Sequence, residues 1–170
     1  MTHSWQNSYE RVYQEVLENP DTDAQSLPYL SAVVKESMRL SLANPVRLPR
    51  LVPEGGLQIP GFPFLPAGTS VGCSAYSLHL DPEVYPRPHD FDPDRWLSMT
   101  PEMLRNSFTF GLGSRQCIAR SFAYAAVVWV AEGLFRSDVL RGVKPVSPSP
   151  ELMYWFNLFV RDGQNKVYWE

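Results

Sequence analysis

The stretch FTFGLGSRQCIAR (residues 108–120) decides how this sequence is interpreted. It places Cys117 between a glycine-containing turn and a run of residues that is typical of a helix. Gly111 and Gly113 allow the backbone to turn closely around the sulfur, where a side chain would clash. Backbone N–H groups and the positive end of the following helix favour a thiolate, and Arg115 adds a cation two residues away.

A thiolate prepared in this way suits a soft or borderline metal, and a single axial thiolate is one known way of holding haem iron. Phe110 is expected to form an apolar wall that keeps water from the sulfur. The alternative is a buried structural cysteine, which does not explain the Phe, Gly and Arg at their offsets from Cys117. Cys73 has no such neighbours, and we expect it to be a buried free thiol in a strand.

A second pattern combines charged residues with an apolar helix. Glu36 and Arg39 are three residues apart and so share a helix face. The common interpretation of such a pair is a solvated surface ion pair, but the face is otherwise apolar. A buried pair needs further hydrogen-bond partners because desolvating both charges costs several kcal/mol. Arg95 in FDPDRW can supply them, since a guanidinium presents five donors and keeps its charge.

Composition limits the class of protein. The 170 residues fit one domain, and 44% hydrophobic content is ordinary for a globular chain. A net charge of −3 gives no electrostatic case for nucleic acid or an anionic membrane. Two cysteines without CxxC spacing argue against a zinc ribbon or a disulfide framework. No apolar run reaches the length of a membrane span and no signal peptide opens the chain, so the sequence taken alone predicts a soluble cytoplasmic protein.

The elements follow from apolar periodicity and from proline and glycine breaks. We expect helices over residues 8–18, from Pro28 until Asn44-Pro45 stops the chain, and over residues 118–136. The last of these is apolar on nearly every side, which predicts burial. Short extended runs between turns over residues 46–75 predict a small sheet. The C-terminal tail predicts two strands around an Asp162-Gly163 turn. The fold class is mixed α+β, mainly α.

Three segments together resemble the cytochrome P-450 monooxygenases. FGLGSRQCIA resembles the family's haem-ligand loop, Phe-x-x-Gly-x-Arg-x-Cys-x-Gly, and Ala119 stands where that pattern has its last glycine. KESMRL is similar to the ExxR helix, and FDPDRW is similar to the meander motif. The resemblance makes Glu36, Arg39 and Arg95 a structural Glu-Arg-Arg network. Residues 76–97 are similar to fungal members in particular.

What the resemblance implies for the site is specific. Cys117 would be the proximal thiolate ligand of haem b iron, within a loop whose family positions are Phe110, Gly113, Arg115, Cys117 and Ala119. Arg115 and Arg50 would be partners of the haem propionates, with His79 as a further candidate.

The substrate pocket would be bordered by Asn44–Leu48 and by the turn near Met153–Asn157. The resemblance covers residues 1–170 as a single partial domain, the C-terminal third of the family fold, without the distal helix that carries an acid-Thr pair. Full-length relatives are usually anchored to the endoplasmic reticulum membrane.

Two functions follow from the resemblance. The first is a haem-thiolate monooxygenase that takes electrons from a reductase and oxidises a small apolar organic substrate, by analogy in fungal secondary metabolism or xenobiotic oxidation. The second is a truncated, catalytically inactive remnant or interaction protein. In either case we expect weak haem binding, or none, by the isolated chain. We also expect an exposed face on the helix over residues 118–136, because the helices that would cover it in the family are missing.

Overall fold

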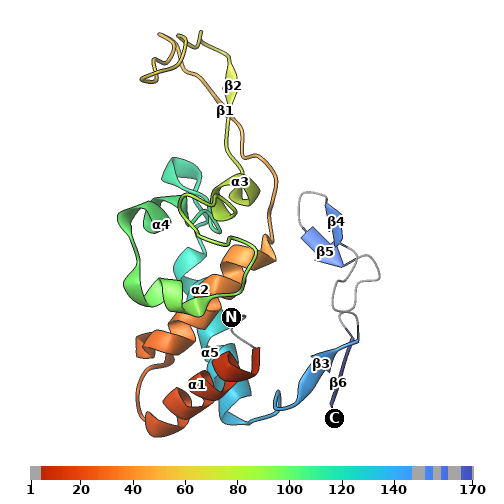
Figure 1. Cartoon of the computed structure of the whole chain (residues 1–170). Coiled ribbons are helices and arrows are strands. Elements are labelled where there is room, and N and C mark those ends of the chain that lie inside the picture. The colour runs from red at the N-terminus through yellow and green to blue at the C-terminus, as the bar shows by residue number, and fades with distance from the viewer. Residues whose placement is uncertain (1–4, 147–151, 155–157, 161–165, 170) are drawn as a thin grey trace.

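Three helices carry most of the packing in this computed structural model, which describes residues 5–146, 152–154, 158–160 and 166–169. They are α1 (Trp5–Glu18), α2 (Pro28–Ser41) and α5 (Arg120–Arg136). Figure 1 shows α2 and α5 crossing in the middle of the molecule with α1 beside them. The three predicted helices are therefore present, with ends that differ by a few residues from the sequence-based bounds.

The N-terminus of α2 is completed by a residue from another helix. Pro28 begins the helix, and the preceding Leu27 has no side chain that can cap it. Glu15 of α1 accepts hydrogen bonds from the backbone N–H groups of Tyr29 and Leu30 at 2.9 and 2.7 Å. A carboxylate at this end satisfies two free donors and complements the helix dipole. This contact fixes α1 against α2.

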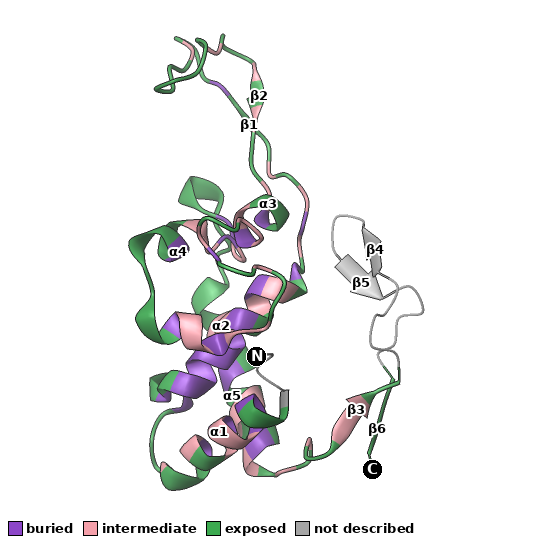
Figure 2. Cartoon of the chain, in the orientation of Figure 1, coloured by how far each residue is buried: buried purple, intermediate pink, exposed green. Residues whose placement is uncertain are grey.

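The main core lies where these three helices meet, together with the short helix η1 (Ala24–Ser26). Figure 2 shows buried residues concentrated along α2 and along the faces of α1 and α5 that meet it. Apolar residues from all four elements form this core, and those that are fully or almost fully buried include Val12, Val16, Leu30, Val34, Val128 and Phe135.

Between α2 and α5 the chain forms a hairpin and a series of short helices. Strands β1 (Arg50–Leu51) and β2 (Ser70–Val71) pair antiparallel and lead into an extension that projects away from the helices (Figure 1). The helices that follow are α3 (Ala75–His79), η2 (Pro93–Ser98), α4 (Pro101–Asn106) and η3 (Gly113–Arg115). The predicted small antiparallel sheet is confirmed, as are the mixed α+β class and the mainly helical character.

The C-terminal strands pair differently from the sequence-based prediction. Strand β4 (Leu152–Tyr154) pairs antiparallel with β5 (Leu158–Val160), so a C-terminal hairpin is present. The last strand, β6 (Val167–Trp169), pairs with β3 (Val143–Pro145) rather than with β5. Sequence periodicity identifies strands but not their partners, since β3 lies more than twenty residues from β6. The Asp162-Gly163 turn lies outside the described residues.

Two burial predictions are wrong. In α5, only Val128 and Phe135 are buried, and large apolar side chains such as Phe122 and Trp129 are more than half exposed. The prediction from the resemblance, that this helix presents an exposed apolar face, is the one that agrees with the structure. Cys73 is exposed and follows β2 instead of lying within a strand, since β2 ends at Val71.

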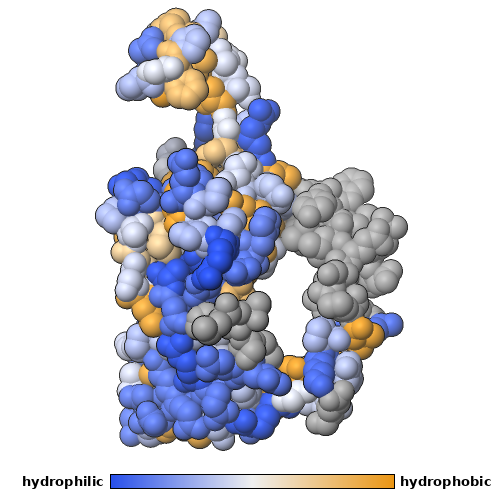
Figure 3. Space-filling model, viewed as in Figure 1, coloured by the Kyte–Doolittle hydropathy of each residue, from blue (hydrophilic) through white to orange (hydrophobic). Residues whose placement is uncertain are grey.

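The surface is mostly hydrophilic over the α1 side in the view of Figure 3, whereas apolar residues gather on the extension beyond β1 and β2. Exposed Leu51, Phe62 and Phe64 contribute to this apolar region. Among the described residues, none of the helices is both long enough and apolar enough to cross a bilayer.

Candidate functional site

Glu36 and Arg39 form a buried, two-pronged ion pair on α2. Arg39 donates from Nε to Glu36 Oε2 and from Nη2 to Glu36 Oε1, each at 2.8 Å. The side chains are 0% and 1% exposed. This fork-on-fork geometry is the strongest arrangement available to the two groups. The surface-pair alternative is therefore wrong for this ExxR.

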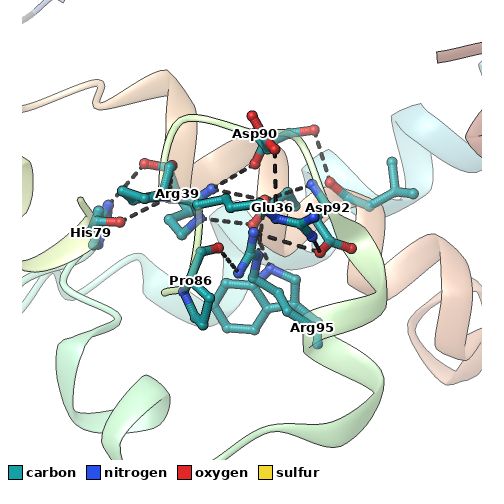
Figure 4. Close-up of polar contacts among 12 residues, drawn as sticks. Glu36, Arg39, His79, Pro86, Asp90, Asp92 and Arg95 are labelled. Carbon is teal, nitrogen blue, oxygen red and sulfur yellow. Dashed lines mark hydrogen bonds and ion pairs between the residues drawn. The ribbon is translucent and has the colours of Figure 1, made fainter. Parts of the chain in front are cut away.

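The remaining donors of Arg39 are used by three backbone carbonyls. Nη1 donates to His79 O at 2.8 Å and to Pro88 O at 2.6 Å, and Nη2 donates to Asp90 O at 3.2 Å. One arginine on α2 thus holds the end of α3 and the loop that precedes η2, as Figure 4 shows. The guanidinium also lies 5.1 Å from the ring centroid of buried Tyr85.

Arg95 reaches the same carboxylate from η2. Its Nε donates to Glu36 Oε1 at 3.2 Å, and its Nη1 donates to Pro86 O at 3.1 Å. The structure therefore brings Glu36, Arg39 and Arg95 together, although 59 residues separate Glu36 from Arg95. The partners that the buried pair was expected to need are present.

Two further donors to Glu36 were not predicted. The Asp92 backbone N–H donates to Oε1 at 2.9 Å, and the Trp96 indole Nε1–H donates to Oε2 at 2.9 Å. Both donors lie at the start of η2 or within it, because the loop before η2 brings this part of the chain next to the carboxylate. The only sequence signal was Trp96 next to Arg95, and an indole N–H needs an acceptor when it is buried.

The electrostatics of Glu36 follow from these contacts. Burial acts to raise the pKa of Glu36, but the hydrogen bonds from Arg39, Asp92 and Trp96 and the charge of Arg39 outweigh it. The net effect is a lowered pKa, so the carboxylate stays ionised at neutral pH. The network is thus a charged junction of α2, α3 and η2 with Glu36 and Arg39 fully buried at its centre.

The Cys117 loop is shaped by two glycine residues with left-handed backbone. Gly111 has φ +68° and Gly113 has φ +74°, in the region that favours glycine. The loop closes through backbone hydrogen bonds, from Gly111 N to Phe108 O at 3.0 Å and from Cys117 N to Phe110 O at 2.8 Å. Cys117 therefore lies in a closed loop, three residues before Arg120 begins α5.

The sulfur-bearing residue is exposed. Cys117 and its neighbours from Leu112 to Phe122 are all exposed, including the apolar Leu112, Ile118 and Phe122. Phe110 is half-buried and lines a cavity of about 670 Å³ together with Trp96, Arg120 and Tyr124. The expectation that Phe110 keeps water from the sulfur is therefore not met in this structure, because Cys117 lies on the surface.

The other residues expected at the site lie at different places. Arg115 is exposed in η3, two residues from Cys117. Ala119 is the N-cap residue of α5 and is also exposed. Arg50 is exposed in β1, where its Nη1 donates to Pro49 O at 2.9 Å. The segment Asn44–Leu48 connects α2 to β1, whereas part of the Met153–Asn157 segment lies outside the described residues.

The His79 ring is buried and bonded to the backbone. It is 1% exposed, and both ring nitrogens take part in hydrogen bonds with backbone groups. No nitrogen is left for a carboxylate, so the expectation for His79 is corrected. It is a buried link between α2, α3 and the Cys117 loop.

Comparisons with known proteins identify the family. Residues 5–132 match the family model for cytochrome P450. The cytochrome P450 monooxygenase mfmF of Annulohypoxylon moriforme is 38% identical over 154 residues, which cover 85% of this chain and 31% of the relative. The fusicoccadiene C-8 hydroxylase of Alternaria brassicicola is 45% identical over 114 residues, which cover 66% of this chain and 21% of the relative.

Solved structures show the same fold. The retinoic acid bound cyanobacterial CYP120A1 aligns with a TM-score of 0.73 and 24% identity, covering 96% of this chain and 39% of that chain. A cytochrome P450 described as CYP102L1 aligns with a TM-score of 0.75 and 21% identity. The chain spans less than a third of the length of these curated fungal relatives. The family model covers three quarters of the sequence, including the Glu36 network and the Cys117 loop, and the chain belongs to the cytochrome P450 family.

Proposed function

We propose that this chain supplies the thiolate side of a haem-thiolate monooxygenase, an oxidoreductase that inserts oxygen into a small apolar organic substrate. Haem b is the proposed cofactor and a reductase the proposed electron donor, with secondary metabolism as the proposed setting. The observation that carries the proposal is the exposed Cys117 at the end of a glycine-turned loop. The names of the fungal relatives, which include a hydroxylase, support catalysis over the non-catalytic alternative.

The residues around Cys117 fit a haem group. The thiol is exposed, so it is sterically accessible to a metal, and it precedes a 17-residue helix whose N-terminal end favours a thiolate. Leu112, Ile118 and Phe122 place exposed apolar surface near the thiol in sequence, which suits a large apolar ring. When bound, a haem iron with a thiolate ligand supplies the activation of dioxygen.

Four residues of the loop and Arg50 of β1 have a proposed part in holding the group. Cys117 would provide the axial sulfur, and Phe110 with Ala119 would shape the loop on either side of it. The Arg115 guanidinium, exposed and on the same loop, would pair with a haem propionate. Arg50 is proposed as a second partner, since the bond to Pro49 O uses only part of its guanidinium.

The Glu36 network would act at a distance from the cofactor. It fixes η2 and the loop before it against α2 through Glu36, and it fixes the end of α3 through Arg39. Its proposed role is to hold α2, α3 and η2 together. No chemistry is assigned to these buried charges.

The test is reconstitution of the chain with haem, followed by reduction and addition of carbon monoxide. A thiolate ligand gives a strongly red-shifted Soret band, and we expect this band in a fraction of the protein at excess haem. We expect Cys117→Ala to abolish it and Cys73→Ala, the matched exposed cysteine, to retain it. A band that survives in Cys117→Ala, or a spectrum of haem held by two histidines, would contradict the proposed ligand.

A further inference from the structure

His79 is joined to two separate parts of the chain through the two nitrogens of its ring. Nδ1 lies 3.0 Å from Arg39 O on α2, and Nε2 accepts a hydrogen bond from the Phe108 backbone N–H at 2.9 Å. His79 is the last residue of α3, and its side chain is buried. Figure 4 shows it at the edge of the Glu36 network, facing Arg39.

The link to α2 is reciprocal. The His79 ring contacts the carbonyl of Arg39, and the Arg39 guanidinium donates to the carbonyl of His79 at 2.8 Å. The position of the ring is therefore set by the same arginine that is locked onto Glu36 by two hydrogen bonds. His79 is consequently joined to the network by two hydrogen bonds with the same residue.

The link to Phe108 reaches the start of the Cys117 loop. Phe108 is buried in a small apolar cluster with Leu42 and Ala75, and its carbonyl accepts from Gly111 N at 3.0 Å. The loop then closes from Cys117 N to Phe110 O at 2.8 Å. Apart from buried Gly111, the residues from Phe110 to Phe122 are half-buried or exposed, so Phe108 is the buried side chain at the start of the loop.

The partners determine the protonation of the ring. A backbone N–H is only a donor, so Nε2 must carry no proton, and a carbonyl is only an acceptor, so Nδ1 must carry one. Burial lowers the pKa of His79, as does the charge of Arg39, whereas the bond to the Arg39 carbonyl and the charge of Glu36 act in the other direction. The net lowering agrees with a neutral ring.

We propose that His79 is a positioning residue that transmits the rigidity of the Glu36 network to the Cys117 loop, through the bond between its Nε2 and the Phe108 N–H. The inference rests on the proposed function in one respect, which is that the positioned loop carries a metal ligand, Cys117. The juxtaposition of Arg39, His79 and Phe108 stands without it.

Two substitutions separate the two links. His79→Asn keeps a donor near the position of Nδ1 but is too short to reach Phe108, whereas His79→Gln can place its amide oxygen near the position of Nε2. The measurement is amide hydrogen exchange in the haem-free chain. We expect His79→Asn to speed exchange of the Phe108 and Cys117 amides by about fivefold or more, since a buried donor loses its acceptor. We expect His79→Gln to restore most of the protection.

The Asp92 amide is the internal reference, because it is bonded to Glu36 and not to His79. A general loss of stability would speed Asp92 as much as Phe108, and that result in both variants would overturn the proposal. An unchanged Phe108 amide in His79→Asn would overturn it as well. Substituting exposed His89 with Asn is the matched control, and we expect it to alter none of these amides.

A second readout concerns the ring itself. The nitrogen resonances of His79 at neutral pH should show the tautomer with the proton on Nδ1, and the opposite tautomer or a charged ring would contradict the proposed link. Neither measurement uses haem. A failure of Cys117 to bind haem would therefore leave these results intact, and a failure here would leave the haem spectrum intact.

Discussion

Two of the sequence motifs that resemble the family, ExxR and the Cys117 loop, lie in opposite environments. Glu36 and Arg39 are buried, and every hydrogen bond of the Glu36 carboxylate described above comes from this chain. Cys117 and the residues around it are exposed, and the thiol lies on the surface. The first motif is therefore satisfied within the chain, whereas the thiol of the second is open to a ligand, as the proposed function requires.

The largest effect on stability should come from a substitution in the buried Glu36 network. Glu36→Ala should lower the free energy of unfolding by about 3–5 kcal/mol, because it leaves two buried guanidinium groups without their carboxylate. Chemical denaturation measures the change. Glu102→Ala is the matched control, since Glu102 forms an exposed ion pair with Arg105 and such pairs contribute about 0–1 kcal/mol. Equal losses in the two variants would show that the network is no more than a surface pair.

A smaller loss is expected at the other end of α2. Glu15→Ala removes the acceptor for the N–H groups of Tyr29 and Leu30 and should cost about 1–2 kcal/mol, the range found for helix caps. Glu18 lies with Glu15 on α1 but is exposed, and Glu18→Ala should have little effect in the same denaturation assay. If the two substitutions cost the same, the cap from α1 does not stabilise α2.

The pH dependence of stability should separate the contribution of His79 from that of Glu36. Folding lowers the pKa of His79, so its contribution is complete above the unfolded value near 6.5 and is lost as the pH falls below it. Folding also lowers the pKa of Glu36, so its contribution is present above about 4.5 and is lost only at more acid pH. Denaturation midpoints measured across this range should fall in two stages, and His79→Gln should remove the first. A single acid stage in both proteins would contradict the account of His79.

The smallest effect on stability is expected from a substitution in the exposed Cys117 loop. Cys117→Ala should leave the free energy of unfolding within about 0.5 kcal/mol of the wild type, since an exposed side chain away from buried contacts contributes little. Cys73→Ala is the matched control in the same denaturation experiment. A loss of several kcal/mol in Cys117→Ala alone would mean that the thiol is structural, and the comparison between the two motifs would fail.

Local pattern was enough to predict the three long helices and the centre of the network, but not the short helices between α2 and α5. The three-residue spacing of Glu36 and Arg39 on an apolar face implied a third partner, and Arg95 is that partner. The Asp92 N–H and the carbonyls around Arg39 could not be predicted, because backbone groups carry no sequence signal and depend on the path of the loop. The link through His79 was missed for the same reason, since both of its partners are backbone groups.

Burial was the property that the sequence predicted least well. The apolar character of α5 predicted a buried helix, yet most of its large side chains are exposed. A hydrophobic pattern indicates which surfaces favour contact, whereas burial depends on which other elements pack against those surfaces. Cys73 shows the same limit, because the number of layers around a short strand is a tertiary property.

The most direct test of the central claim is the carbon monoxide spectrum of the reduced, haem-reconstituted Cys117→His protein beside that of the wild type. Imidazole would replace thiolate as the axial ligand, and the ligand sets the electronic properties of the iron. The account predicts that haem is still bound but that the strongly red-shifted band is replaced by one at the position typical of histidine-ligated haem. A band at the same position in both proteins would show that Cys117 is not the ligand.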